Sequence, residues 1–273
     1  MRTKLRDIQI AYTDQGSGMS LVFVHGFPLN RHAWAKQLGA FRTAFHVTAP
    51  DLRGFGESVG TPGAVAMSCF AEDLFALLDH LKTGPVILVG HSMGGYIALA
   101  FAKAFPQMLR GLVLVGTKAG PDSPESALAR RATAETVRLK GVSVVVDSMA
   151  VKMLSPSNAD SNLVTAVKGL MASSKPEGVI SALLGMAERP DAGAWLGKIK
   201  VPTLVITGAD DAIMPTHESE ALAKAIENST LKLIPNAGHL VAFEQADAFN
   251  GILGDWLAGM ASKRPLIREP GPL

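Results

Sequence analysis

The stretch Val86–Ile97, VILVGHSMGGYI, decides how the rest of the chain is interpreted. Val86–Val89 is an unbroken apolar run, which is typical of a strand buried on both faces of a parallel sheet. Gly90–Gly95 follows directly, and Tyr96–Ala104 has the composition of a helix. A sharp strand-to-helix turn with a serine at its apex and a glycine two residues to either side matches the motif G-x-S-x-G. The sequence therefore predicts that Ser92 is a nucleophile exposed at the end of a central strand.

Nucleophilic chemistry would explain each part of this motif. The tight turn strains the backbone of Ser92, and a Cβ atom at Gly90 or Gly94 would collide with the neighbouring chain. The helix behind Ser92 directs free N–H groups and its positive dipole end toward the place where an oxyanion would form. Taken alone, the pattern is equally compatible with a glycine-rich turn that carries no chemistry. The rest of the chain has to decide between these interpretations.

Length and composition restrict the class of protein. The 273 residues fit one large α/β domain with an insertion, or two smaller domains, and 48% hydrophobic residues suffice for a sizeable core. The net charge of +2 gives no indication of a nucleic-acid or membrane partner. A single cysteine, Cys69, excludes an intramolecular disulfide and a cysteine-based zinc cluster. Because no signal-peptide core or membrane-length apolar run occurs, we expect a cytoplasmic protein.

Buried apolar runs alternate with helical patterns on both sides of the Ser92 motif. The clearest helix is Ser68–Lys82, whose leucines recur at a spacing of three and four residues. The other expected helices of this part of the chain are Asn30–Phe41, His217–Ile226 and Phe243–Leu257. The expected strands are Leu5–Thr13 at an edge, Leu21–Val24, Phe45–Ala49, Gly111–Val115, Pro202–Thr207 and Leu231–Ile234. This alternation predicts an α/β fold with an open, mostly parallel central sheet and helices on both faces.

The strand pattern stops between Lys118 and about Gly197. Helix signals replace it, at Pro124–Lys140, Val142–Leu154, Asp160–Ser173 and Pro176–Arg189. The run Val144–Val146 could also indicate a strand, but we favour helix. We therefore predict a core domain of residues 1–117 and 198–260, a helical cap of residues 118–197 laid over the carboxyl edge of the sheet, and a flexible tail of residues 261–273.

Reactive side chains follow four of the predicted strands. Because ligands bind at the carboxyl ends of strands in open α/β sheets, these side chains can converge. A serine nucleophile needs a base, and the base needs a carboxylate that fixes its tautomer. His239, in a Gly-His turn after the last strand, is the best candidate base. We expect His25 to order the loop that follows it, and His91, next to Ser92, to point away from the nucleophile.

The acid and the oxyanion hole follow from spacing. Asp211 is favoured over Asp210 as the acid because a proline stands four positions after it, a spacing typical of such loops. An oxyanion hole needs two backbone donors. One is the N–H of Met93, directly after the nucleophile, and the other belongs to the loop His25–Pro28, where Phe27 is the candidate because proline has no N–H.

The lining of the substrate pocket is harder to infer. We expect Trp34, Met149 and Met153 to line it, although we favour helix packing as the explanation of methionines in the cap. Asp51–Gly54 is interpreted as a loop held by structural salt bridges rather than as a binding loop. Because no metal-binding or nucleotide-binding motif occurs, we expect no metal and no organic cofactor.

Five segments together resemble the α/β-hydrolase superfamily. They are HGFP at 25–28, DLRGFGES at 51–58, GHSMGG at 90–95, GADDAIMP at 208–215 and NAGHLVAFEQ at 236–245. Within the superfamily, the chain is similar to small cofactor-free esterases and lactonases, such as 3-oxoadipate enol-lactonases, carrier-protein methyl ester esterases and perhydrolase-like enzymes. The resemblance implies an α/β-hydrolase fold, with Ser92 as nucleophile, Asp211 as acid and His239 as base. Serine rather than aspartate at position 92 argues against the haloalkane dehalogenase and epoxide hydrolase branches.

The main hypothesis is a serine hydrolase that cleaves a carboxylic ester of a small to medium, largely apolar substrate through an acyl-enzyme. A first alternative is a lactonase or C–C bond hydrolase that acts on a carboxylated intermediate. It needs a cation, which Arg130, Arg131 or Arg138 could supply, although a solvated basic helix face explains these arginines more simply. A cofactor-free perhydrolase and a ligand receptor built on the same fold are further alternatives.

Overall fold

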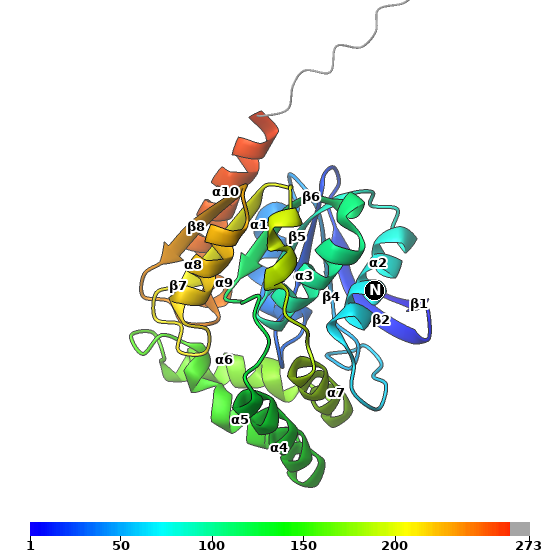
Figure 1. Ribbon diagram of the computed structural model, residues 1–273, viewed down its shortest axis with the longest axis vertical. Coiled ribbons are helices and arrows are strands. Elements are labelled where there is room, and N and C mark those ends of the chain that lie inside the picture. The colour runs from blue at the N-terminus through cyan, green and yellow to red at the C-terminus, as the bar shows by residue number, and fades with distance from the viewer. Residues whose placement is uncertain (263–273) are drawn as a thin grey trace, which may run out of the picture.

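The central feature is an eight-stranded sheet with helices on both faces (Figure 1). The computed structural model describes residues 1–262, and the strands lie in the order β1-β2-β4-β3-β5-β6-β7-β8. β1 pairs antiparallel with β2 and β2 antiparallel with β4, and the remaining neighbours are parallel. The strands are β1 Arg2–Leu5, β2 Ile8–Gln15, β3 Ser20–Val24, β4 His46–Pro50, β5 Val86–His91, β6 Leu109–Val115, β7 Thr203–Gly208 and β8 Ser229–Ile234. The predicted open, mostly parallel sheet is confirmed.

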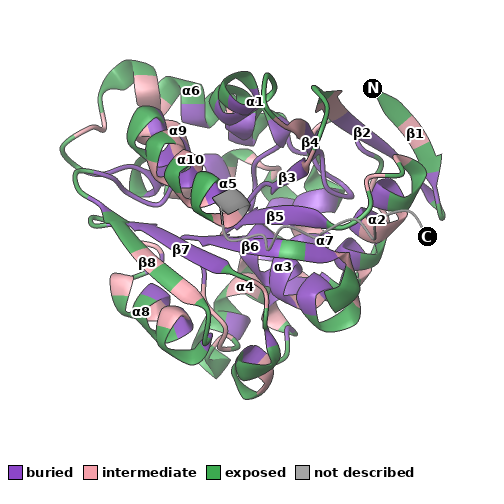
Figure 2. Cartoon of the chain, turned by 90° about the horizontal axis from the view of Figure 1, so that it is seen from above, coloured by how far each residue is buried: buried purple, intermediate pink, exposed green. Residues whose placement is uncertain are grey.

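Alternate side chains of the central strands enter two separate cores. Val86 and Leu88 of β5 face one core, whereas Ile87 and Val89 face the other. Helices α2, α3 and α8 cover the first core, and α1 and α10 cover the second. Their bounds are α1 Ala35–Phe41, α2 Met67–His80, α3 Met93–Ala104, α8 Thr216–Ala225 and α10 Ala246–Ser262, with the short α9 at Val241–Glu244. Because both faces are covered, the central strands are buried, whereas β8 at the edge is partly exposed (Figure 2).

The amino-terminal edge of the sheet differs from the prediction. A single edge strand over Leu5–Thr13 is wrong, because the chain forms an antiparallel hairpin of β1 and β2 that turns at Arg6 and Asp7. Arg6 adopts a positive φ of 52° in this turn. No glycine and no asparagine marks the turn, so the sequence lacks the usual hairpin signal.

Helices α4 to α7 gather at one end of the molecule (Figure 1). Several hydrogen bonds connect this region to loops at the carboxyl edge of the sheet, and two of them are typical. Ser174 Oγ donates to the carbonyl of Pro28 at 2.8 Å, and the N–H of Leu240 donates to the carbonyl of Met153 at 2.8 Å. The elements are α4 Pro124–Lys140, α5 Ser143–Met149, η3 Val151–Met153, α6 Ser161–Ala172 and α7 Pro176–Ala187. The short η1 Arg31–Trp34, η2 Pro106–Met108 and η4 Gly193–Lys198 lie elsewhere.

The segment predicted as a cap is helical in the structure. No strand interrupts residues 118–197, and the ambiguous Val144–Val146 run lies in α5. The predicted tail of residues 261–273 begins too early, because α10 continues to Ser262. The rest of that tail, residues 263–273, lies outside the described residues.

Candidate active site

Ser92 occupies the sharp turn between β5 and α3. Its backbone has φ 53° and ψ −115°, a conformation that residues with a side chain rarely adopt. Thr117 Oγ1 donates to the Ser92 carbonyl at 2.9 Å and helps to hold this turn. An added Cβ at Gly90 would collide with the carbonyl of Gly94, and one at Gly94 with the carbonyl of Val24. The predicted steric reason for both glycines is therefore confirmed.

Asp211 and His239 form a buried contact at the ends of β7 and β8. His239 Nδ1 lies 2.8 Å from Asp211 Oδ2, and neither side chain is more than 1% exposed. The other carboxylate oxygen, Oδ1, accepts the backbone N–H groups of Ile213 at 2.9 Å and Met214 at 2.7 Å. Because an ionised carboxylate only accepts hydrogen bonds, His239 Nδ1 carries the proton. The lone pair of His239 Nε2 is then free to act as a base.

The environment of Asp211 favours its charged form. Burial by itself would raise the pKa of this carboxyl. The neighbouring His239 and the backbone donors of Met214 and Ile213 outweigh burial, so the pKa of Asp211 lies below its ordinary value. Asp211 is therefore ionised at neutral pH.

Ser92 and His239 line one cavity of about 300 Å³, which we call the Ser92 cavity. Phe27, Met149 and Ile213 contribute apolar walls to it. Within residues 1–262, the Ser92 hydroxyl makes no hydrogen bond. Nucleophile–base hydrogen bonds are often long without substrate and shorten in the complex. The cavity thus brings the predicted nucleophile and base to the same space.

Two backbone N–H groups near Ser92 have no hydrogen-bond partner in the described part of the chain. They belong to Phe27, which lines the Ser92 cavity, and to Met93. Met93 is the first residue of α3, so its N–H has no partner inside the helix. Both groups are available to bind an anion, as an oxyanion hole requires.

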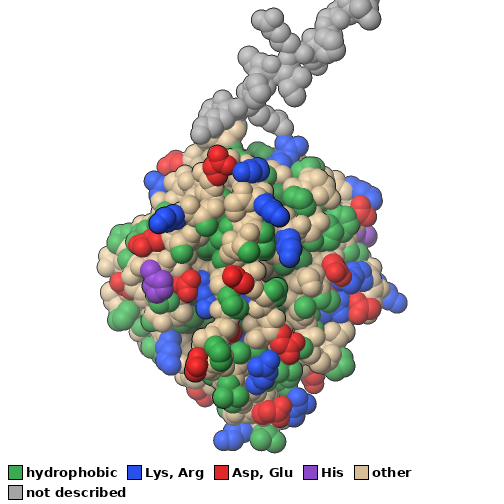
Figure 3. Space-filling model, viewed as in Figure 1, with side chains coloured by type: hydrophobic (Ala, Val, Ile, Leu, Met, Phe, Trp, Pro, Cys, Tyr) green, Lys and Arg blue, Asp and Glu red, His purple; other side chains and the backbone are tan. Residues whose placement is uncertain are grey.

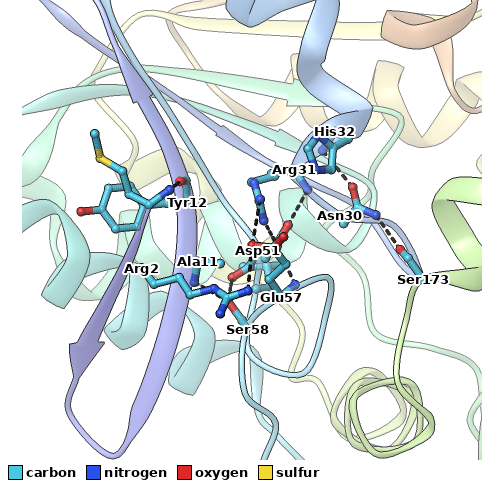
Figure 4. A network of polar contacts seen from close by, with 12 residues as sticks. Arg2, Ala11, Tyr12, Asn30, Arg31, His32, Asp51, Glu57, Ser58 and Ser173 are labelled. Atoms are coloured by element: carbon cyan, nitrogen blue, oxygen red, sulfur yellow. Dashed lines mark hydrogen bonds and ion pairs between the residues drawn. The ribbon is translucent and has the colours of Figure 1, made fainter.

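A buried polar network holds the loop that carries Phe27 (Figure 4). Asp51, directly after β4, accepts the backbone N–H of Arg31 at 2.8 Å and forms an ion pair with its guanidinium. Asp51 also accepts the N–H of Glu57 at 2.8 Å, and Glu57 pairs with Arg31 at 3.1 Å. These contacts connect η1, which follows the Phe27 loop, to the loop after β4.

The predicted structural salt bridges in Asp51–Gly54 are confirmed, but with distant partners. Besides the Asp51 network, Arg53 pairs with Asp73 at 2.7 Å and with Asp7 at 2.8 Å. The Arg53 and Asp73 side chains are nearly fully buried. The loop is therefore anchored to α2 and to the hairpin, and it does not line the Ser92 cavity.

The two competing histidines are buried and make structural contacts. His25 Nε2 accepts the N–H of Leu52 at 3.0 Å, so Nδ1 carries a proton and donates to the Gly26 carbonyl at 2.9 Å. Burial lowers the pKa of His25. His91 Nε2 donates to the His239 carbonyl at 2.9 Å, and burial together with the neighbouring His239 lowers the pKa of His91 to about 3. Both rings are therefore neutral, and neither lines the Ser92 cavity.

Two of the three predicted pocket residues lie elsewhere. Trp34 is 2% exposed and packs under α10 in the second core, with its ring 5.1 Å from that of Phe23 and 6.0 Å from that of Phe249. It faces away from the cavity because η1, which carries Trp34, and the following α1 cover the face of the sheet opposite α3. Met153 is fully buried in the first core, so its prediction as a lining residue is also wrong. Met149 does line the Ser92 cavity.

Sequence reasoning missed a charged cluster at the Ser92 cavity. The Asp122 side chain is 2% exposed and pairs with Arg130, with Arg189 at 3.1 Å and with Lys118 at 3.8 Å. Burial alone would raise the pKa of Asp122, but the arginines keep it below its ordinary value. Lys118, Asp122, Arg130 and Glu218 all line the cavity. Two cations, Lys118 and Arg130, and two carboxylates therefore line the cavity, whereas Arg189 contacts Asp122 from outside its lining.

The structure separates the three arginines that the sequence left together. Arg130 lines the Ser92 cavity, so the interpretation of this residue as part of a solvated face is wrong. Arg131 and Arg138 are half exposed and pair with surface glutamates at 3.8 Å and 3.3 Å. No local motif distinguishes Arg130, because its partner Asp122 precedes the helix that carries it.

Other classes of site are not evident in residues 1–262. This part of the chain contains no group of three histidine, cysteine or acidic side chains that could hold a metal ion. It also contains no helix that is long and apolar enough to cross a membrane. On the face shown in Figure 3, basic and acidic side chains are interspersed with apolar ones.

Comparison with known proteins assigns the class. Residues 21–252 match the model of the alpha/beta hydrolase family, and the chain belongs to this family. The fold and the resemblance predicted from the sequence are thereby confirmed.

Among individual proteins, the chain is similar to a thermophilic esterase from Thermogutta terrifontis, solved with malate bound. The two are 40% identical with a TM-score of 0.93, over 95% of this chain and 99% of that one. The chain is 28% identical to 3-oxoadipate enol-lactonase 2 of Acinetobacter baylyi, over 90% of this chain and 91% of the relative. It is also 30% identical to a 2-hydroxy-6-oxononadienedioate/2-hydroxy-6-oxononatrienedioate hydrolase of Burkholderia vietnamiensis, over 92% and 91%.

Proposed function

We propose that this protein is a carboxylic ester hydrolase with Ser92 as nucleophile, His239 as general base and Asp211 as the acid that orients the base. The observation that carries the proposal is the buried 2.8 Å contact between Asp211 and His239 Nδ1. It leaves Nε2 unprotonated in the cavity that also contains the strained Ser92. This combination is what activation of a serine hydroxyl requires.

In the proposed reaction, Ser92 Oγ attacks the ester carbonyl carbon while His239 Nε2 takes the hydroxyl proton. The carbonyl oxygen becomes an oxyanion, which accepts hydrogen bonds from the N–H groups of Phe27 and Met93. One such donor typically stabilises the transition state by about 3 kcal/mol. His239 then protonates the leaving alcohol, and the Ser92 acyl-enzyme remains. Water, deprotonated by His239, attacks this ester, releases the carboxylic acid and restores Ser92.

The size and lining of the cavity support a small substrate. A volume of about 300 Å³ lies at the lower end of the range for small-molecule sites. Phe27, Met149 and Met214 offer apolar contacts near the nucleophile. Short-chain acyl esters fit these properties.

Matched variants on short p-nitrophenyl esters test the proposal. We expect Ser92→Ala and His239→Gln to lower kcat/KM by about 1,000-fold or more, because each removes an essential part of the nucleophilic unit. His217→Gln, at an exposed histidine of α8, serves as the control and should retain wild-type activity. Activity that survives Ser92→Ala would refute the mechanism. A wild-type protein that shows no repeated turnover on any ester would favour the receptor alternative.

A second candidate substrate class is an ester or lactone that carries a carboxylate. Arg130 and Lys118 favour it, because both cations line the Ser92 cavity and share their carboxylate partner, Asp122, with Arg189. Malate, bound in the Thermogutta terrifontis esterase, is itself a dicarboxylate. Arg130→Gln should then lower kcat/KM for a monoester of a dicarboxylic acid at least about tenfold more than for a neutral ester of equal length, because a charged hydrogen bond is lost. Arg131→Gln is the matched surface control, and equal effects on both esters would exclude this class.

A further inference from the structure

A second cavity lies next to the Ser92 cavity. Its volume is about 520 Å³, and one stripe of α3 forms its floor, with Tyr96, Leu99, Ala100 and Lys103 at helical spacing. We call it the α3 cavity. It exists because small residues surround it, namely Ala66, Ala100, Ala104, Ala119, Gly185 and Ala192. The proposed mechanism does not use this space.

Tyr96 stands between the two cavities. Tyr96 and Lys118 are the residues that line both of them. Tyr96 follows Ser92 by four positions, about one turn of α3, so its ring lies close to the nucleophile along the helix. Tyr96 is only 5% exposed. A ring in this position closes the Ser92 cavity on the side that faces the larger apolar space.

Arg189 holds the Tyr96 ring in place. The centre of the guanidinium lies 3.8 Å from the ring centroid, a close cation–π contact. Arg189 in turn donates to Asp122 at 3.1 Å and to the Gly120 carbonyl at 2.5 Å, and its side chain is 4% exposed. Because Arg189 is buried and both ends of its guanidinium are hydrogen-bonded, it opposes rotation of the Tyr96 ring away from its position between the two cavities.

We infer that Tyr96, clamped by Arg189, limits the length of ester that Ser92 can process by separating it from the α3 cavity. The inference rests on the proposed function. The alkyl arm of a longer ester would occupy the α3 cavity once the ring is removed, because Leu99, Ala100 and Ala104 offer it an apolar surface. Tyr96 is thus a specificity-determining residue.

The test compares ester lengths within each variant. The readout is the ratio of kcat/KM for p-nitrophenyl decanoate to that for p-nitrophenyl butyrate. We expect Tyr96→Ala to raise this ratio about tenfold or more, since even one accommodated methylene changes kcat/KM by about that factor. Tyr96→Phe keeps the ring and should leave the ratio unchanged. If Tyr96→Ala does not fold, Tyr96→Leu removes the aromatic partition with less loss of volume and should shift the ratio in the same direction.

A variant that fills the α3 cavity tests whether the alkyl arm of the ester enters that cavity. Ala100 lines the α3 cavity but not the Ser92 cavity, so Ala100→Phe alone should leave the ratio unchanged. In the Tyr96→Ala background it should abolish the gain. An unchanged ratio in a folded, butyrate-active Tyr96 variant would overturn the inference, as would a gain that Ala100→Phe does not reverse. A fall in the ratio for Ala100→Phe alone would also overturn it, because the wild type would already use the α3 cavity. These results leave the proposed function intact, because Ser92→Ala and His239→Gln test it separately.

Discussion

Replacing Asp211 by asparagine probes the acid–base pair without changing its shape. Asp211 Oδ1 accepts two backbone N–H groups, from Ile213 and Met214. The oxygen of an asparagine has to take this position, because a side-chain NH₂ there would face two donors. Its NH₂ group would then point at His239 Nδ1 and hold that nitrogen unprotonated. The His239 proton would move to Nε2, where it prevents the ring from accepting the proton of Ser92.

The magnitude follows from two separate losses. Losing a hydrogen bond to a charged group costs about 1.5–3 kcal/mol, which corresponds to roughly 10-fold to 150-fold in rate. Reversal of the tautomer adds to this loss because it removes the general base. In a serine protease with a Ser-His-Asp triad the same substitution lowers kcat about 10,000-fold, or roughly 5.5 kcal/mol. We expect Asp211→Asn to show a loss of this size.

The assay is kcat/KM on p-nitrophenyl butyrate, with Asp210→Asn as the matched control. Asp210 is exposed and accepts a hydrogen bond from Ser155 Oγ at 2.6 Å, so its substitution should leave activity within about twofold of the wild type. A loss of less than about 100-fold for Asp211→Asn would refute the tautomer argument. An equal loss for Asp210→Asn would show that the acid has been assigned to the wrong residue.

Three further predictions concern stability and are checked by urea unfolding. Gly94→Ala should lower the free energy of unfolding by about 1–3 kcal/mol or prevent folding, because the added Cβ would meet the backbone of Val24 and His25. Gly39→Ala is the control and should not destabilise the protein, because no atom lies within 4 Å of its added Cβ. Equal effects of the two substitutions would contradict this reasoning. Arg53→Met breaks a buried ion pair and leaves Asp73 with only the partly exposed Arg6, so it should cost about 3 kcal/mol, the lower end of the range for a broken buried pair. Lys200→Met, in an exposed ion pair, should cost at most about 1 kcal/mol. The pKa of His91 is about 3 in the folded protein and 6.5 ordinarily, so between these values the unfolded chain binds a proton that the folded one does not. The free energy of unfolding should therefore fall by roughly 1 kcal/mol for each unit by which the pH is lowered below 6.5. His91→Gln should weaken this pH dependence, and an unchanged dependence would contradict the reasoning.

The sequence predicts those site residues whose position depends only on where one strand ends. Ser92, Asp211 and His239 each lie within five positions after the carboxyl end of a strand of the parallel part of the sheet, so local pattern and strand order suffice to bring them to one edge. Their convergence in the structure needs no information about side-chain packing between distant elements.

Trp34 shows where local pattern fails. The strand order runs from β3 to β4 in one direction and from β5 to β6 in the other. With right-handed crossovers, α1 and α3 must therefore cover opposite faces of the sheet. The face of the sheet on which Trp34 packs depends on this change in the direction of the strand order, and not on the residues next to Trp34 in the sequence. The pairing of Asp122 with Arg189, 67 positions later, likewise leaves no local signal.

Asp122 has a consequence for how this protein can change over generations. It contacts Arg130, which lines the Ser92 cavity, and Arg189, which clamps Tyr96. On the roles proposed above, one carboxylate supports both the preference for substrate charge and the limit on substrate length. A mutation at Asp122 would shift both traits at once, whereas a mutation at Tyr96 would alter length alone. Adaptation toward longer neutral esters is therefore open through a single step at Tyr96, but adaptation through Asp122 cannot separate the two traits.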